Sequence, residues 1–191
     1  MTGPAKRAVV IGASAGAVQA LLTVLPALPA DYPLPVLVVV HVPPDRSNVL
    51  APFFQARCRI AVKEAEDKEP AAGGVVYFAP SDYHLLVERE GTLALSTDEA
   101  VNYSRPSIDV LFESAADAYG ASLTGVILTG ANEDGAKGLE AVMNAGGEVI
   151  VEDPADAYAA TMPDAALGAC ARAKVMTLQA IASHLVGLGT V

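Results

Sequence analysis

Three polar residues of this chain have the types and the sequence settings that acyl-transfer chemistry requires. Ser14 follows an apolar run and is flanked by small residues, His41 follows five apolar residues, and Asp134 precedes a glycine in an acidic loop. A hydroxyl becomes a nucleophile when an imidazole takes its proton and a carboxylate orients that imidazole. If folding brings the three side chains together, the sequence predicts a hydrolase of the Ser-His-Asp type.

The turn around Ser14 supports this hypothesis but also has other interpretations. Small neighbours allow a tight strand-to-helix turn that exposes the hydroxyl, and N–H groups of the following helix could stabilise an oxyanion. Serine is also a common helix N-cap. The pattern Gly12-x-Ser14-x-x-Ala17 is a degraded dinucleotide fingerprint, with Asp31 lying 19 residues beyond Gly12. A ribose-binding acid would lie at the end of the second strand, however, and His41 stands there instead.

The histidine and the acid each have a simpler structural explanation. A histidine at the exit of a strand suits a general base, because imidazole titrates near neutrality, but it could also cap the edge of the sheet. Glu133 and Asp134 could both serve as first-turn acids of the next helix, and position alone does not choose between them. His84 and His184 are expected in solvated surface positions.

Short apolar runs separated by helix-period stretches predict the elements that position these residues. The runs at 7–12, 35–42 and 123–129 are typical of buried parallel strands. Strands separated by helices pair in parallel through right-handed crossovers, so their carboxyl ends meet at one edge of the sheet. We expect one α/β domain over residues 1–191: a doubly wound, mostly parallel sheet flanked by helices, with a small antiparallel β insertion around residues 75–96. Ser107 should open a helix as a hydroxyl N-cap.

Composition argues against several other classes of function. The chain has 12 Lys and Arg against 22 Asp and Glu, a net charge of −10, which disfavours a nucleic-acid or anionic-membrane surface. The first residues lack the pattern of a signal peptide and no apolar run could span a bilayer, so a cytoplasmic protein is expected. Cys58 and Cys170 form no disulfide or metal motif, and three dispersed histidines offer no ligand spacing. We expect no metal and no cofactor.

Six stretches, in order over nearly the whole chain, resemble the catalytic domain of the chemotaxis protein-glutamate methylesterases. They are VVIGASAG around Ser14, VVHVPP around His41, YFAPSDYH, NYSRPSIDVLF, GVILTGANEDG around Asp134, and ATMP. Each stretch is moderately specific, and together they are hard to explain by chance. The resemblance implies that Ser14 is the nucleophile, His41 the base and Asp134, rather than Glu133, the orienting acid.

The same resemblance implies an activity and partners. Family members hydrolyse glutamyl methyl esters on the cytoplasmic helices of methyl-accepting chemoreceptors, releasing methanol, and some also deamidate receptor glutamines. The implied oxyanion donors are the backbone N–H groups of Ala15 and Ala131, and Arg105 is a candidate substrate contact. Because the first strand begins near Arg7, we expect no receiver domain in this chain, so that regulation would come from a separate receiver domain or from fused signalling domains.

The chain departs from the family pattern in two loops. Ser14-Ala15-Gly16-Ala17 replaces the usual Ser-Thr-Gly-Gly, and Gly130-Ala131-Asn132-Glu133-Asp134-Gly135 replaces Gly-Met-Gly-x-Asp-Gly. Losing the methionine should enlarge the pocket, and losing a glycine should alter the path of the loop. These departures leave a second hypothesis, a catalytically silent module that docks on receptors or signalling partners. Since receptor segments are themselves Glu-rich, docking would depend on local cations such as Arg46 or Arg105, or on a tether.

Overall fold

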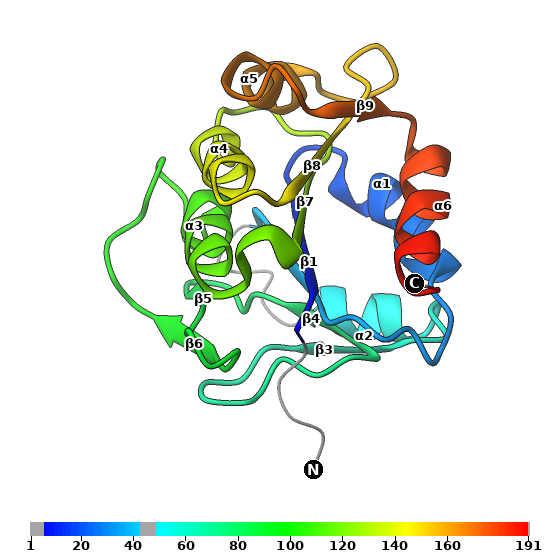
Figure 1. The fold of residues 1–191 in the computed structure, drawn as a ribbon, viewed down its shortest axis with the longest axis vertical. Helices are drawn as coiled ribbons and strands as arrows, with labels where there is room; N and C mark the ends of the chain where they lie inside the picture. The colour runs from blue at the N-terminus through cyan, green and yellow to red at the C-terminus, as the bar shows by residue number, and fades with distance from the viewer. Residues whose placement is uncertain (1–5, 43–48, 191) are drawn as a thin grey trace.

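The structure, a computed structural model, describes residues 6–42 and 49–190. Within these ranges, seven parallel strands form one sheet (Figure 1) in the order β3-β4-β2-β1-β7-β8-β9. The predicted doubly wound α/β fold is therefore confirmed. The strands are β1 (Ala8–Ala13), β2 (Val36–Val40), β3 (Ala61–Glu64), β4 (Val75–Phe78), β7 (Leu123–Ile127), β8 (Glu148–Glu152) and β9 (Lys174–Met176).

Helices cover both faces of the sheet, and for this reason the central strands β1 and β2 carry no polar side chain. Successive side chains of a strand point to opposite faces, so Val9 and Ile11 pack on one side and Val10 on the other. The first side is covered by α1 (Ala17–Val24), α2 (Leu50–Gln55) and α6 (Leu178–Leu188). The second is covered by α3 (Ile108–Tyr119), α4 (Ala136–Asn144) and α5 (Thr161–Ala169). In the part of the chain that the structure describes, two short 3-10 turns are η1 (Leu25–Ala27) and η3 (Gly120–Ser122).

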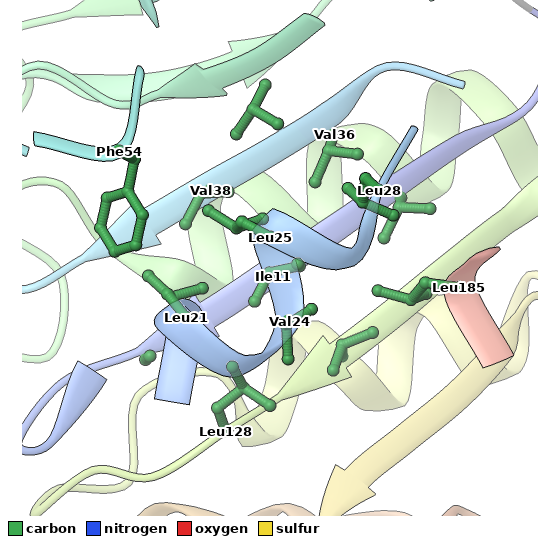
Figure 2. Packing of buried hydrophobic residues seen from close by; sticks show 14 of the residues in the cluster. Ile11, Leu21, Val24, Leu25, Leu28, Val36, Val38, Phe54, Leu128 and Leu185 are labelled. Carbon is green, nitrogen blue, oxygen red and sulfur yellow. The ribbon is translucent and has the colours of Figure 1, made fainter. Parts of the chain in front are cut away.

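The core on the α1 side fixes how the first helix lies against the first two strands. Figure 2 shows Leu21, Val24 and Leu25 packed over Ile11 of β1 and Val38 of β2, all of them fully buried. This packing sets the direction in which the chain leaves β1, and so the position of the turn that contains Ser14.

The antiparallel part of the fold is smaller than the range 75–96 expected from the sequence. It is the hairpin of β5 (His84–Val87) and β6 (Leu93–Ser96). Strand β4 instead lies inside the main sheet, between β2 and β3. Its alternate side chains, Val76 and Tyr77, are buried on opposite faces, and this two-sided burial belongs to a sheet interior rather than to a surface hairpin.

The chain reverses direction across the sheet at β1. It first adds β2, β4 and β3 on one side of β1, and later adds β7, β8 and β9 on the other. A crevice at the carboxyl ends of the strands is expected at such a reversal. None of the helices in the described part of the chain has the length and apolar character that crossing a membrane would require.

Candidate active site

Ser14 and His41 leave the sheet side by side at its carboxyl edge. Strands β1 and β2 pair with Ala13 opposite Val40, so Ser14 and His41 are the next residues on neighbouring strands. The backbone continues this pairing, because the His41 N–H donates to the Ala13 carbonyl at 3.3 Å. Adjacent strands lie about 4.8 Å apart, which puts the two side chains within reach of each other. Within the described residues, the Ser14 hydroxyl makes no hydrogen bond to His41.

His41 is paired with Asp134, the acid that the family resemblance favoured. The His41 Nε2 lies 2.7 Å from Asp134 Oδ2, and the Asp134 side chain is fully buried. Since an ionised carboxylate can only accept, Nε2 carries the proton and Nδ1 keeps the free lone pair. The Asn132 amide nitrogen lies 3.1 Å from this Nδ1. Glu133, the other acid of the loop, is exposed.

Asp134 also caps the helix that begins at residue 108. Its carboxylate accepts from the backbone N–H groups of Ile108 at 2.7 Å and Asp109 at 3.2 Å, and from the Ser107 hydroxyl at 2.8 Å. Asn102 Nδ2 donates to it at 2.8 Å. The prediction that the Ser107 hydroxyl caps this helix is therefore wrong: Ser107 occupies the N-cap position, but its hydroxyl donates to Asp134, whose carboxylate takes the free N–H groups.

The two buried carboxyl groups of the site, Asp134 and Asp109, have pKa values shifted in opposite directions. Burial raises the pKa of Asp134, but hydrogen bonds from His41, Ile108, Asn102 and Ser107 outweigh it and hold the pKa below its ordinary value. For Asp109, burial dominates and the pKa is raised, although it accepts hydrogen bonds from its own partners. Asp134 therefore remains an anion beside the imidazole, which an orienting acid must do.

The predicted oxyanion donors are the backbone N–H groups of Ala15 and Ala131. In the described residues, neither Ala15 nor Ala131 donates its N–H to a protein group. Thr129 links the two loops: its carbonyl accepts from the Ser14 N–H at 2.9 Å and its hydroxyl donates to the Ala15 carbonyl at 2.8 Å. Gly16, in the left-handed conformation at φ 83°, completes the turn before α1.

Arg105 lies in the wall of a cavity next to His41, and four of its five N–H donors already bond to protein oxygens. The cavity has a volume of about 450 Å³ and is lined by His41, Tyr103 and Arg105 among others. The Arg105 guanidinium pairs with Asp82 at 2.7 Å and donates to two backbone carbonyls of residues 97 and 98. Arg105 therefore shapes the cavity by tying two loops together. The other proposed cation, Arg46, lies outside the described residues.

His84 is buried, and Gly12 is in close contact with α3. His84 was expected at a solvated position, but it is 2% exposed, with Nδ1 accepting from the Ser107 N–H at 3.2 Å. That expectation was wrong because the hairpin folds back over α3. A Cβ at Gly12 would lie 2.5 Å from Ile108 Cγ2, so close helix packing explains this glycine without a bound phosphate.

Three residues with a part in this geometry went unrecognised in the sequence: Asn102, Thr129 and Asn132. The contacts of these residues depend on partners distant in the chain or on the direction of the side chain, and no local sequence pattern indicates either. Asn102 donates to both Asp134 and Asp109, and it adopts a left-handed conformation at φ 53°. Asparagine tolerates that conformation better than most residues, which is the one local signal available.

A buried carboxylate paired with an imidazole, next to a half-buried serine turn, is the arrangement of serine-type hydrolases, and this α/β fold with its carboxyl-edge site defines that class. The family model described as CheB methylesterase matches residues 9–185. The chain belongs to the CheB methylesterase family.

Individual relatives agree with this assignment. A protein of Leptospira interrogans, provisionally named a protein-glutamate methylesterase/protein-glutamine glutaminase, is 45% identical over 95% of this chain and 94% of its own length. A protein of that combined name from Symbiobacterium thermophilum is 41% identical over 94% of this chain, which spans only 50% of that relative. The crystal structure of the Thermotoga maritima CheB methylesterase catalytic domain matches with a TM-score of 0.91 at 34% identity, covering 98% of this chain and 100% of that one.

Proposed function

We propose that this protein hydrolyses glutamyl methyl esters on the cytoplasmic helices of methyl-accepting chemoreceptors. The observation that carries the proposal is the pairing of His41 with the buried Asp134 at 2.7 Å, on the strand next to Ser14. Membership of the CheB methylesterase family supports the substrate class. We further propose that residues 1–191 act as one catalytic domain, in the cytoplasm.

The reaction begins when His41 Nδ1 takes the Ser14 hydroxyl proton as Oγ attacks the ester carbonyl carbon. The negative charge moves to the carbonyl oxygen, where the N–H groups of Ala15 and Ala131 stabilise it. The tetrahedral intermediate then breaks its bond to methoxide, which takes the proton from Nδ1 and leaves as methanol. Asp134 remains ionised and stabilises the imidazolium between the two transfers.

The second half of the reaction restores Ser14. Water gives a proton to His41 Nδ1 and attacks the acyl carbon, and the bond to Oγ breaks as Oγ takes that proton back. The glutamate carboxylate is released. A glutamine amide would follow the same route with ammonia as the leaving group, which fits the glutaminase activity in the relatives' names.

We also propose how the receptor substrate is recognised and how the activity is regulated. Arg105 is engaged with Asp82, so we place it in the cavity wall and not in direct charge pairing with substrate. The chain spans half of the Symbiobacterium relative, and a receiver domain or fused signalling domain is the regulator that we propose.

The test is methanol release from methylated chemoreceptor cytoplasmic fragments, measured beside a Ser14→Ala variant. We expect release by the unaltered protein and a loss on the order of 10⁶ in kcat for Ser14→Ala or His41→Ala, because such residues act as a unit. Near-normal release by Ser14→Ala would refute the mechanism. Binding to the fragments without methanol release at any protein concentration would instead favour the silent docking module.

A further inference from the structure

The nitrogen that must act as base is already occupied in this structure. Because Nε2 of His41 donates to Asp134, the lone pair that would accept the Ser14 proton is on Nδ1. The Asn132 amide nitrogen lies 3.1 Å from that atom, and no described contact links Nδ1 to the Ser14 hydroxyl.

The orientation of the Asn132 amide follows from its second contact. Its Oδ1 accepts from the Asp134 backbone N–H at 3.0 Å, so the NH₂ group is the end that faces His41. The loop around it is held at both ends: Gly130 N–H donates to the Ala159 carbonyl at 3.1 Å, and Gly135 N–H donates to Asp109 at 3.0 Å. The side chain is therefore directed at His41 by a fixed backbone.

A single ring lone pair cannot accept two linear hydrogen bonds at once. We propose that Asn132 is a positioning residue that competes with Ser14 for Nδ1 of His41 and holds the site in a resting arrangement. The inference rests on the proposed function, since it needs Ser14 as the nucleophile. Catalysis must break the contact, because Nδ1 carries a proton after the first transfer and then faces an NH₂ group that can only donate.

Three variants distinguish two roles of Asn132: competition with Ser14 for His41 Nδ1, and support of the loop through the Asp134 N–H. Asn132→Ala removes both contacts of the amide. Asn132→Ser keeps an oxygen that can accept from the Asp134 N–H in a two-residue turn, but its hydroxyl is too short to reach His41. Glu133→Ala, an exposed neighbour, is the matched control for a change in the same loop.

The first measurement is the rate at which a fluorophosphonate probe labels Ser14, which requires no receptor. Both Asn132 variants should be labelled roughly 2- to 12-fold faster than the unaltered protein, the range expected when one neutral hydrogen bond of the resting state is removed. Glu133→Ala should be labelled at the unaltered rate. Methanol release from receptor fragments should rise by the same factor.

The second measurement is the ¹⁵N NMR signal of His41 Nδ1, which a purely structural role of Asn132 would leave unchanged. It should shift toward that of a free imidazole nitrogen in both Asn132 variants and remain in place in Glu133→Ala. Labelling that is unchanged or slower in Asn132→Ser would overturn the competition. A protein whose Ser14 is never labelled would refute the proposed function itself, which distinguishes the two failures.

Discussion

At the scale of single residues, Asp134 has two tasks that one carboxylate can perform together. It orients His41 through Oδ2, and it accepts from Ser107, from Asn102 and from the first N–H groups of α3. The donors keep its pKa below the ordinary 3.8 despite its burial. The carboxylate that we propose as the orienting acid therefore also stabilises the start of α3.

This dual role predicts a pH-dependent stability effect for Ser107→Ala. The variant loses a buried hydrogen bond to a charged group and should lower the free energy of unfolding by about 1.5–3 kcal/mol at pH 7. A carboxyl group whose folded-state pKa is lowered stabilises the protein above its unfolded-state pKa, and this contribution is lost as pH falls through the folded value. The cost of Ser107→Ala should therefore shrink below about pH 4.

Urea unfolding between pH 7 and pH 3 measures this change. Thr177→Ala is the matched control, because Thr177 caps α6 by accepting from the Ala180 N–H and involves no ionised group. Its cost of about 1 kcal/mol should not vary with pH. A Ser107→Ala cost that is constant over the same range would contradict the assignment of an ionised Asp134.

At the scale of elements, α3 and α4 cap each other. Asp134, just before α4, accepts the first N–H groups of α3, while Asp109, in the first turn of α3, accepts from Gly135 at 3.0 Å and Gly138 at 2.7 Å at the start of α4. Helix starts leave such N–H groups unpaired, and the positive end of each helix favours a nearby anion. The acid loop is thus held by the packing of two helices.

Gly138→Ala should disturb this pair of helices. A Cβ at position 138 would lie 2.6 Å from Phe112 Cβ and 3.0 Å from the Asp109 Cα, so α3 would have to move. We expect a net loss of about 1–2 kcal/mol in the free energy of unfolding, because overpacking outweighs the helix propensity of alanine. Esterase activity should fall as well, since Asp109 and Asp134 share the displaced backbone.

The control for this prediction is Gly187→Ala in α6, where nothing lies within 4 Å of the added Cβ. That change should stabilise the protein by up to about 1 kcal/mol in the same urea titration. Equal effects of the two substitutions would mean that the contact between α3 and α4 tolerates a methyl group.

At the scale of the whole molecule, the net charge of −10 governs how the protein meets an acidic partner. Like charges repel over about a Debye length, roughly 10 Å at 0.1 M salt, and added salt weakens this repulsion. We therefore expect kcat/KM on Glu-rich receptor fragments to rise several-fold between about 0.02 M and 0.3 M NaCl.

A small neutral ester is the control, because its hydrolysis should not depend on salt. A fall in kcat/KM on receptor fragments with increasing salt would reveal a locally positive docking surface that the total charge conceals.

Much of this architecture could be predicted from the sequence because its signals are local. Buried apolar runs mark β1, β2 and β7, parallel pairing follows from the helices between them, and the shared edge follows from parallel pairing. The assignment of β4 to the antiparallel insertion was wrong, because the sequence of a short strand does not indicate which strands it pairs with. Its place between β2 and β3 depends on burial from both faces, which only distant residues supply.

By itself, the sequence determined the residues available for chemistry and the strand ends from which Ser14 and His41 leave. The choice of Asp134 over Glu133 was open in the local pattern, and the tertiary structure decided which carboxylate contacts His41, 93 positions away. The structure likewise decided that Asn132 faces the imidazole and that His84 is buried. The physical reason is the same in each case: side-chain direction at a loop depends on which helix packs against it, and neighbouring residues in the chain do not encode that contact.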